Sequence, residues 1–189
     1  MNLEERLRRA LENTGALSFS GIGYRFVALR YANPERALSG EGAALYAGRY
    51  NPAGIRTVYL SEDARTAVAE TGYGISLGGR FAAKDREARL LLAVEFRLQR
   101  VLDLRNPAIL ERLDLNAHDL VHPGWREVLR QGKKPFTHVL ALAALGAGFE
   151  AILAPSAVIT GAYNLAIYVE KLVPGSFLRL SESPSASIK

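Results

Sequence analysis

Three side chains that could act together on an anionic substrate lie within one short stretch, Gly40 to Glu70. Arg49 lies in a turn-forming sequence, Ala47 to Pro52, and Tyr59 lies in a short apolar segment that follows it. An arginine binds anionic oxygens through forked hydrogen bonds, and a fixed carboxylate such as Glu70 can stabilise developing positive charge. A turn, a strand and a helix can therefore converge on one cleft.

Local composition predicts which element carries each of these side chains. Gly48 and Pro52 favour a turn around the arginine, and Thr57 to Leu60 has the β-branched and aromatic composition of a strand. Ser61 precedes two acids, which predicts a helix start capped by the serine hydroxyl. Glu70 then lies near the helix C-terminus, where the macrodipole disfavours an acid. A functional role would explain this small cost, although surface acids also tolerate it.

Two further candidates lie outside this stretch. Ile22 to Leu29 is expected to form a strand with Arg25 on the face opposite two aromatic residues, a pattern that is also typical of a solvent-exposed strand arginine. Phe149 to Leu153 is expected to form a core strand, with Ser156 just beyond its carboxyl end. A serine there could simply cap a turn, and no Gly-x-Ser-x-Gly sequence marks it as a hydrolase nucleophile.

Taken in order, these segments resemble the RES domain, a family named for an arginine, a glutamate and a serine. The segments that carry the resemblance are Tyr24-Arg25, Leu38 to Ala43, GEGAALYAGRYNPAG from Gly40, VYLSEDARTAVAE from Val58, APSA from Ala154 and GAYN from Gly161. Together they span roughly Tyr24 to Lys171. The family usually has tryptophan after the central arginine. Tyr50 stands there in this chain, so an aromatic residue is retained and the turn is expected to be kept.

The resemblance implies a fold and a biological class. RES proteins are typically toxins of bacterial toxin-antitoxin pairs, resemble ADP-ribosyltransferase toxins in fold, consume NAD, and are neutralised by a helix-turn-helix antitoxin. We therefore expect a single α+β domain with a mixed or split β-sheet, flanking helices and a nucleotide cleft between the parts of the sheet. The irregular order of strands and helices independently favours α+β over a doubly wound array.

The resemblance also implies a role for each candidate residue in cleaving the bond between nicotinamide and ribose. Glu70 would stabilise positive charge on the ribose carbon, as carboxylates do in glycoside cleavage. Arg25 and Arg49 would bind the diphosphate or a ribose edge and support catalysis, Tyr59 would stack on nicotinamide or ribose, and Ser156 would hold a phosphate or ribose hydroxyl. NAD is then the substrate, and no metal or additional cofactor is expected.

The acceptor of the ADP-ribosyl group is open at this level. Water or inorganic phosphate would make the protein an NAD glycohydrolase or phosphorylase, which we favour, whereas a protein side chain would make it an ADP-ribosyltransferase. An alternative from a different class is a non-catalytic module that binds NAD or ADP-ribose, with Glu70 only a surface acid. The antitoxin is expected to act by covering the cleft, through a segment such as its C-terminal tail.

Composition limits the remaining classes. The chain has 189 residues, a net charge of +5 and no cysteine, which suits one domain without disulfides or thiolate metal sites. The basic residues are scattered, so direct binding to nucleic acid is the weakest hypothesis. Because no run of about 18 uncharged apolar residues occurs, no membrane association is expected and a cytoplasmic location is predicted. His118 and His122 are four residues apart, but no carboxylate is spaced to complete a zinc motif, so a metal site is not favoured.

The expected domain plan has three parts. Residues 1–15 form an N-terminal helical extension, residues 16–175 form the RES-like domain, and residues 176–189 form an edge segment and a polar tail. Further expected elements are a loop at residues 31–47, a strand at 89–98 extended by 101–104, helices at 107–113, 125–131 and 137–145, a strand at 164–171 and an edge strand at 177–180.

Overall fold

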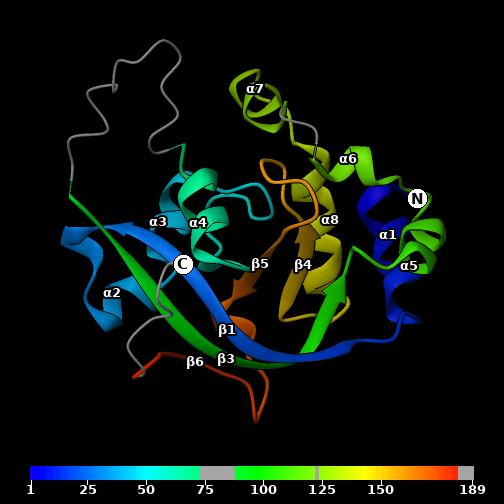
Figure 1. Cartoon of the computed structure of the whole chain (residues 1–189). Helices are drawn as coiled ribbons and strands as arrows, with labels where there is room; N and C mark the ends of the chain where they lie inside the picture. The colour runs from blue at the N-terminus through cyan, green and yellow to red at the C-terminus, as the bar shows by residue number, and fades with distance from the viewer. Residues whose placement is uncertain (73–87, 122–123, 183–189) are drawn as a thin grey trace.

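The computed structural model describes residues 1–72, 88–121 and 124–182, which form an α+β fold with a mixed sheet and flanking helices (Figure 1). The strands are β1 Leu17–Ala28, β2 Thr57–Ser61, β3 Arg89–Asp103, β4 Ala151–Pro155, β5 Tyr163–Tyr168 and β6 Phe177–Leu180. The helices are α1 Leu3–Glu12, α2 Pro34–Leu38, α3 Glu41–Tyr46, α4 Ala64–Glu70, α5 Pro107–Leu113, α6 Ala117–Val121, α7 Trp125–Arg130 and α8 Phe136–Gly146. The predicted fold class is confirmed.

The sheet is split into two halves. Its strand order is β1-β2-β5-β4-β3-β6, with an additional pairing between β1 and β3. One half contains β1, β3 and β6, and the other contains β2, β5 and β4. The halves meet where β3 runs parallel to β4, and where Tyr24 of β1 pairs with Ser61 of β2. In Figure 1 the long β1 and β3 curve beneath β4 and β5.

Two apolar layers hold this arrangement together. The first lies between the two halves of the sheet and includes Leu60, Val94 and Leu165. The second lies between β4, β5 and the helices α1, α5 and α8, and includes Leu104 and Leu140. Strands whose residues are buried on both faces, such as β4 with its sequence AILAP, follow from this layering.

Helix α1 belongs to the second apolar layer, although it precedes the region of RES resemblance. The side chain of Asn2 caps it by accepting a hydrogen bond from the Glu5 backbone N–H at 2.8 Å. Leu7 and Leu11 are each only 1% exposed and pack in the same cluster as residues of α8. The N-terminal helix is therefore part of the packed core.

Three predicted elements were wrong in detail. Residues 31–47 are not a loop, because Asn33 caps α2, Pro34 opens it, and α3 follows. The cap of α4 is Asp63 and not Ser61, which instead ends β2. The last core strand stops at Tyr168, where residues 169–171 turn into a 3-10 helix.

The other expected elements agree with the structure to within a few residues. The edge segment at 177–180 is β6, which pairs with β3. The end of the polar tail, residues 183–189, lies outside the described residues. Within the described ranges, no helix has the length and apolar character needed to cross a membrane.

Candidate functional site

Most of the predicted site residues line one cavity of about 840 Å³. Arg25 reaches it from β1, Arg49 from the turn before β2, Tyr59 from β2 and Glu70 from the end of α4. Residues of α7 and of the loop after β4 complete its wall. Ser156 does not line the cavity, but its hydroxyl donates a hydrogen bond to the Glu70 carboxylate. The structure therefore brings all five residues to one place.

The hydroxyl of Tyr59 closes the turn that carries the arginine. It accepts a hydrogen bond from the Tyr50 backbone N–H at 2.9 Å and donates one to Oδ1 of Asn51 at 2.8 Å. Burial raises the pKa of Tyr59 well above its ordinary value, so the hydroxyl remains a donor. Gly48 is required here, since an added Cβ would lie 2.5 Å from the Tyr59 oxygen. The Tyr59 ring lines the cavity while its hydroxyl is committed to the turn.

The turn that carries Arg49 is anchored by Tyr50 and by contacts to Leu120. Tyr50 is only 4% exposed, and its hydroxyl donates to the Leu120 carbonyl oxygen at 3.2 Å. The guanidinium of Arg49 also donates to Leu120, at 3.3 Å. Ala47 has a φ of 58°, a conformation that costs an alanine on the order of 1–3 kcal/mol. The aromatic residue after the arginine thus anchors the turn, as expected, within a strained backbone.

Arg25 is held by a single described hydrogen bond, from Nη1 to the Tyr59 carbonyl oxygen at 3.1 Å. Its Nε is buried and has no hydrogen-bond partner in the structure. Burial lowers the pKa of Arg25, although a guanidinium still remains charged at neutral pH. A desolvated cation therefore lines the cavity, where an anionic ligand would pair with its charge.

Glu70 is fixed by two short hydrogen bonds that converge on one carboxylate oxygen. Ser156 Oγ and Asn164 Nδ2 each donate to Oε1 at 2.6 Å. The Asn164 carbonyl oxygen in turn accepts from Ser61 Oγ at 2.7 Å. The carboxylate at the helix C-terminus is thus tied to β5 and to the loop after β4, so it is more than a tolerated surface acid.

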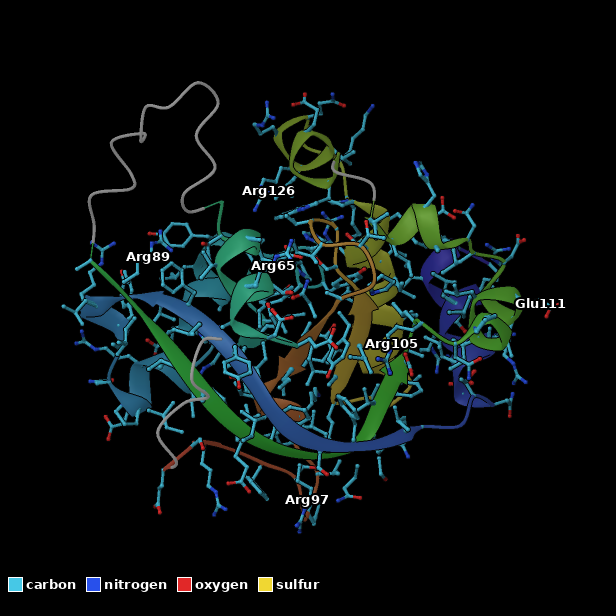
Figure 2. All side chains as sticks on the ribbon, viewed as in Figure 1. Arg65, Arg89, Arg97, Arg105, Glu111 and Arg126 are labelled. Carbon is cyan, nitrogen blue, oxygen red and sulfur yellow. The ribbon has the colours of Figure 1, made fainter. Side chains whose placement is uncertain are left out.

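Several residues of the site were not among the predicted site residues. Asn164 appeared only as the last residue of the GAYN segment, and Ser61 was interpreted as a helix cap. Arg126 and Arg130 reach the cavity from α7, which is at the top of the view in Figure 2, where Arg126 is labelled. Asn51 donates to the carbonyl oxygens of Pro52 and Ile55 in its own loop and of Ala43 in α3, a role that only the folded turn reveals.

His138 of α8 also supports the turn. It is 1% exposed, and its Nε2 lies 2.8 Å from the Gly48 carbonyl oxygen. Because a carbonyl can only accept, Nε2 carries the hydrogen. Burial lowers the pKa of His138 below its ordinary value of 6.5. The neutral imidazole thus links α8 to the turn next to Arg49.

This burial predicts a loss of stability in acid. As pH falls through about 6.5, the unfolded chain binds a proton that the folded His138 resists, so the free energy of unfolding falls by up to about 1.4 kcal/mol per pH unit. The His138→Gln variant keeps an N–H donor and should lose this part of the slope between pH 7 and pH 5. Urea unfolding at each pH measures it. The exposed His118→Gln variant is the control, and an equal slope in wild type and His138→Gln would contradict the assignment.

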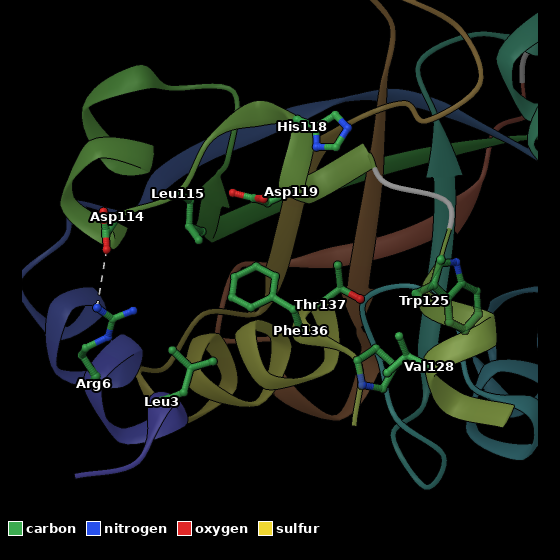
Figure 3. Close-up of a pocket in the computed structure, with 12 residues that line it drawn as sticks. Leu3, Arg6, Asp114, Leu115, His118, Asp119, Trp125, Val128, Phe136 and Thr137 are labelled. Carbon is green, nitrogen blue, oxygen red and sulfur yellow. Dashed lines mark ion pairs between the residues drawn. The ribbon is translucent and has the colours of Figure 1, made fainter. Parts of the chain in front are cut away.

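A second cavity, of about 520 Å³, lies between α1, α6, α7 and α8 (Figure 3). Arg6 of α1 forms an ion pair with Asp114 across its rim at 3.7 Å. His118, considered above as a metal ligand, lies here beside Asp119, whereas His122 lies outside the described residues. Within residues 1–72, 88–121 and 124–182, no three His, Cys, Asp or Glu side chains gather as a metal site would require.

Comparison with protein families agrees with this geometry. The model of the RES domain matches residues 23–178. The chain belongs to the RES domain family. The matched region begins at β1 and ends in β6, so it contains every residue of the cavity but leaves out α1. In this RES protein the N-terminal helix lies outside the family match and packs into the core.

Curated relatives of this RES protein include the proteins named NAD(+) phosphorylase MbcT from Mycobacterium bovis (strain ATCC BAA-935 / AF2122/97) and Mycobacterium tuberculosis (strain ATCC 25618 / H37Rv). Each is 29% identical over 125 residues, which are 65% of this chain and 65% of the relative. The alignment thus covers just under two thirds of the relatives' length.

The fold also matches a solved structure. A chain in the crystal structure of the M. tuberculosis MbcT-MbcA toxin-antitoxin complex superposes with a TM-score of 0.71 at 24% sequence identity. The match covers 96% of this chain and 92% of that chain. The α+β architecture of this RES protein, including its split sheet, is therefore shared.

Proposed function

We propose that this protein cleaves the nicotinamide–ribose bond of NAD and transfers the ADP-ribosyl group to inorganic phosphate. The observation that carries the proposal is one fixed carboxylate, Glu70, in the same cavity as the partly unsatisfied Arg25 and the turn-borne Arg49. RES family membership and the relatives named NAD(+) phosphorylase support it. The alternative acceptor is water, and the experiment below distinguishes this hydrolysis from transfer to phosphate.

The chemistry follows from the residue types in the cavity. Nicotinamide leaves with the electron pair of the bond to the anomeric carbon, and positive charge builds on the ribose. The Glu70 carboxylate stabilises that charge more strongly in the transition state than in the bound substrate, which is the condition for catalysis. An oxygen of hydrogen phosphate then forms the new bond to the anomeric carbon. The products are nicotinamide and ADP-ribose 1″-phosphate.

The charge of the cavity supports a second anion beside NAD. Among the described residues that line it, the ionic side chains are Glu70 and four arginines: Arg25, Arg49, Arg126 and Arg130. Arg25 and Arg49 are sufficient to bind the diphosphate of NAD. Arg130 is paired with Glu127 at 2.6 Å, whereas Arg126 stacks on the Trp125 ring at 4.5 Å. Arg126 is therefore our candidate for binding the phosphate acceptor.

The test follows free nicotinamide by chromatography after purified protein is mixed with NAD, with and without inorganic phosphate. Phosphorolysis predicts release that rises with phosphate to saturation and a phosphorylated ADP-ribose product. Release that is independent of phosphate would mean hydrolysis. Absence of release, with NAD binding still seen by calorimetry, would contradict the enzymatic proposal and favour a non-catalytic binding module.

The Arg126→Gln variant is expected to raise the KM for phosphate about tenfold while leaving the KM for NAD within about twofold, because one charge-assisted hydrogen bond to the acceptor is lost. Steady-state rates over a matrix of both substrates measure the two constants separately. Arg97→Gln, on the exposed side of β3, is the matched control. An unchanged phosphate KM would remove Arg126 from the acceptor site.

We also propose that a helix-turn-helix antitoxin neutralises this protein in the bacterial cytoplasm by covering the cavity. The MbcT-MbcA complex supports the existence of such a partner. Three side chains at the cavity carry exposed apolar surface: Tyr46 at 82%, Val158 at 45% and Leu129 at 39%. Exposed apolar surface around a cleft is typical of a protein-binding site.

A further inference from the structure

We infer that Ser61 and Asn164 form a hydrogen-bonded relay that orients the Glu70 carboxylate, with Ser61 acting as a positioning residue. The three side chains are joined by two bonds, 2.7 Å from Ser61 to Asn164 and 2.6 Å from Asn164 to Glu70. The catalytic consequence of the relay rests on the function proposed above, whereas the relay itself follows from contacts alone.

The fold places the two relay residues directly opposite each other. Ser61 is the last residue of β2, and its partner in the antiparallel register with β5 is Asn164. Opposite residues in such a pair project from the same face of the sheet with their Cβ atoms close together. Ser61 is 7% exposed, so its hydroxyl needs a partner within the protein. The relay is thus built into the pairing of two core strands.

The backbone determines the direction of the hydrogen bond between Ser156 and Glu70. The Ser156 oxygen accepts from the backbone N–H groups of Val158 at 3.1 Å and Ile159 at 3.0 Å. Its single proton is then donated to Glu70 at 2.6 Å. A hydroxyl has one proton, so Ser156 has none to offer a substrate in this arrangement. Ser156 therefore acts through the carboxylate as well.

The other end of the relay determines the orientation of the amide. Ser61 donates to the carbonyl oxygen of Asn164, which directs the NH₂ group toward Glu70. The reversed amide would place its carbonyl oxygen at 2.6 Å from the carboxylate oxygen, a repulsive contact. Without the Ser61 hydroxyl, the buried amide loses the partner that favours the productive orientation.

The relay also determines which carboxylate oxygen is available. Both donors bind Oε1 of Glu70, and Oε2 accepts no hydrogen bond from the part of the chain that the structure describes. A carboxylate held through one oxygen presents the other in a defined direction. Misorientation of such a group by a small angle is enough to reduce catalysis substantially. The relay therefore directs Oε2 toward the cavity, where the ribose would bind.

The test compares Ser61→Ala with Ser61→Thr, which retains the hydroxyl. We expect Ser61→Ala to lower kcat for nicotinamide release about 10- to 100-fold, with the KM for NAD within about twofold, since one hydrogen bond supporting a charged group is lost. Ser61→Thr should recover kcat to within about threefold. Ser18→Ala, an exposed serine on β1, is the matched control. A wild-type kcat in Ser61→Ala would overturn the inference.

A second variant keeps the proposal falsifiable if Ser61 changes impair folding. Asn164→Asp preserves size and the acceptor for Ser61, but replaces the donor to Glu70 with a second carboxylate oxygen. Two carboxylates at this distance repel, so kcat should fall more than in Ser61→Ala while the melting temperature identifies a folded protein. A folded Asn164→Asp variant with wild-type kcat would contradict the relay.

A readout that does not need activity separates this inference from the proposed function. The side-chain amide protons of Asn164, identified by their loss in Asn164→Asp, should exchange slowly with solvent in wild type, faster in Ser61→Ala and slowly again in Ser61→Thr. If wild type releases no nicotinamide but this exchange pattern holds, the function is wrong and the relay stands. Equal exchange in all three proteins would overturn the relay.

Discussion

The Glu70→Gln variant is expected to release nicotinamide at least about a thousandfold more slowly than wild type while binding NAD with similar affinity. An electrostatic group that acts mainly on the transition state contributes on this scale, and its removal affects kcat more than binding. Glutamine has almost the same shape as glutamate. Its carbonyl oxygen can replace Oε1 and accept from both Ser156 and Asn164. The variant therefore removes the charge and leaves the surrounding hydrogen bonds intact.

Chromatography of nicotinamide measures the rate, and calorimetry with NAD measures binding. Glu35→Gln is a matched control, because Glu35 is an exposed helical acid on α2 away from the cavity wall. Retained turnover in Glu70→Gln would refute the assignment of Glu70. Loss of both turnover and NAD binding would instead mean that the carboxylate contributes to binding the ground state.

The Arg25→Gln variant is expected to raise the KM for NAD at least about tenfold without lowering the melting temperature. The guanidinium lines the cavity and makes one described hydrogen bond, from Nη1 to the Tyr59 carbonyl oxygen, so an anionic ligand can pair with its charge. Charge-assisted hydrogen bonds to phosphate are among the stronger ones. Glutamine offers one neutral donor group in their place.

The stability part of this prediction follows from the pKa of Arg25. Burial lowers this pKa because the charged guanidinium is less favourable in the folded protein than in the unfolded chain, although it remains charged at neutral pH. Removing the charge relieves that cost and compensates for the lost bond to Tyr59. A melting curve without NAD and kinetics with NAD measure the two effects. Arg65→Gln, an exposed arginine on α4 outside the cavity wall (labelled in Figure 2), should change neither.

A lower melting temperature in Arg25→Gln, with an unchanged KM, would show that this arginine is structural. An unchanged melting temperature with a raised KM for NAD would show that Arg25 binds the ligand, which would then offset the cost of burying the guanidinium in the free protein. Ala47, with its positive φ next to the Arg49 turn, is a second residue at this site held in an unfavourable state.

Much of the site could be predicted from local chemistry. The turn around Arg49, the strand that carries Tyr59 and the helix that ends in Glu70 all form where composition and turn residues indicate. Signals of this kind depend on the backbone preferences of a few adjacent residues, so they can be recognised without knowledge of the tertiary structure. The RES resemblance then connected these segments with Arg25 and Ser156, which lie far away along the chain.

Residues whose roles depend on pairing between distant strands were misinterpreted or missed. Ser61 has the local pattern of a helix cap, yet the pairing of β2 with β5 directs its hydroxyl to Asn164. Asp63, two residues later, is the cap of α4. Ser61 and Asp63 are both of a type that commonly caps helices. Because β2 pairs with β5 as far as Ser61, the helix begins later and Asp63 is its cap.

The sequence by itself determined the fold class, the family and the residue types that can bind a diphosphate and stabilise a positively charged ribose. Only the tertiary structure decided how those residues act, because a hydroxyl or amide has no role until its partner is known. His138 supports the Arg49 turn from α8, and Ser156 donates its one proton to Glu70. These contacts join segments more than 80 residues apart, and no local pattern encodes the register that brings them together.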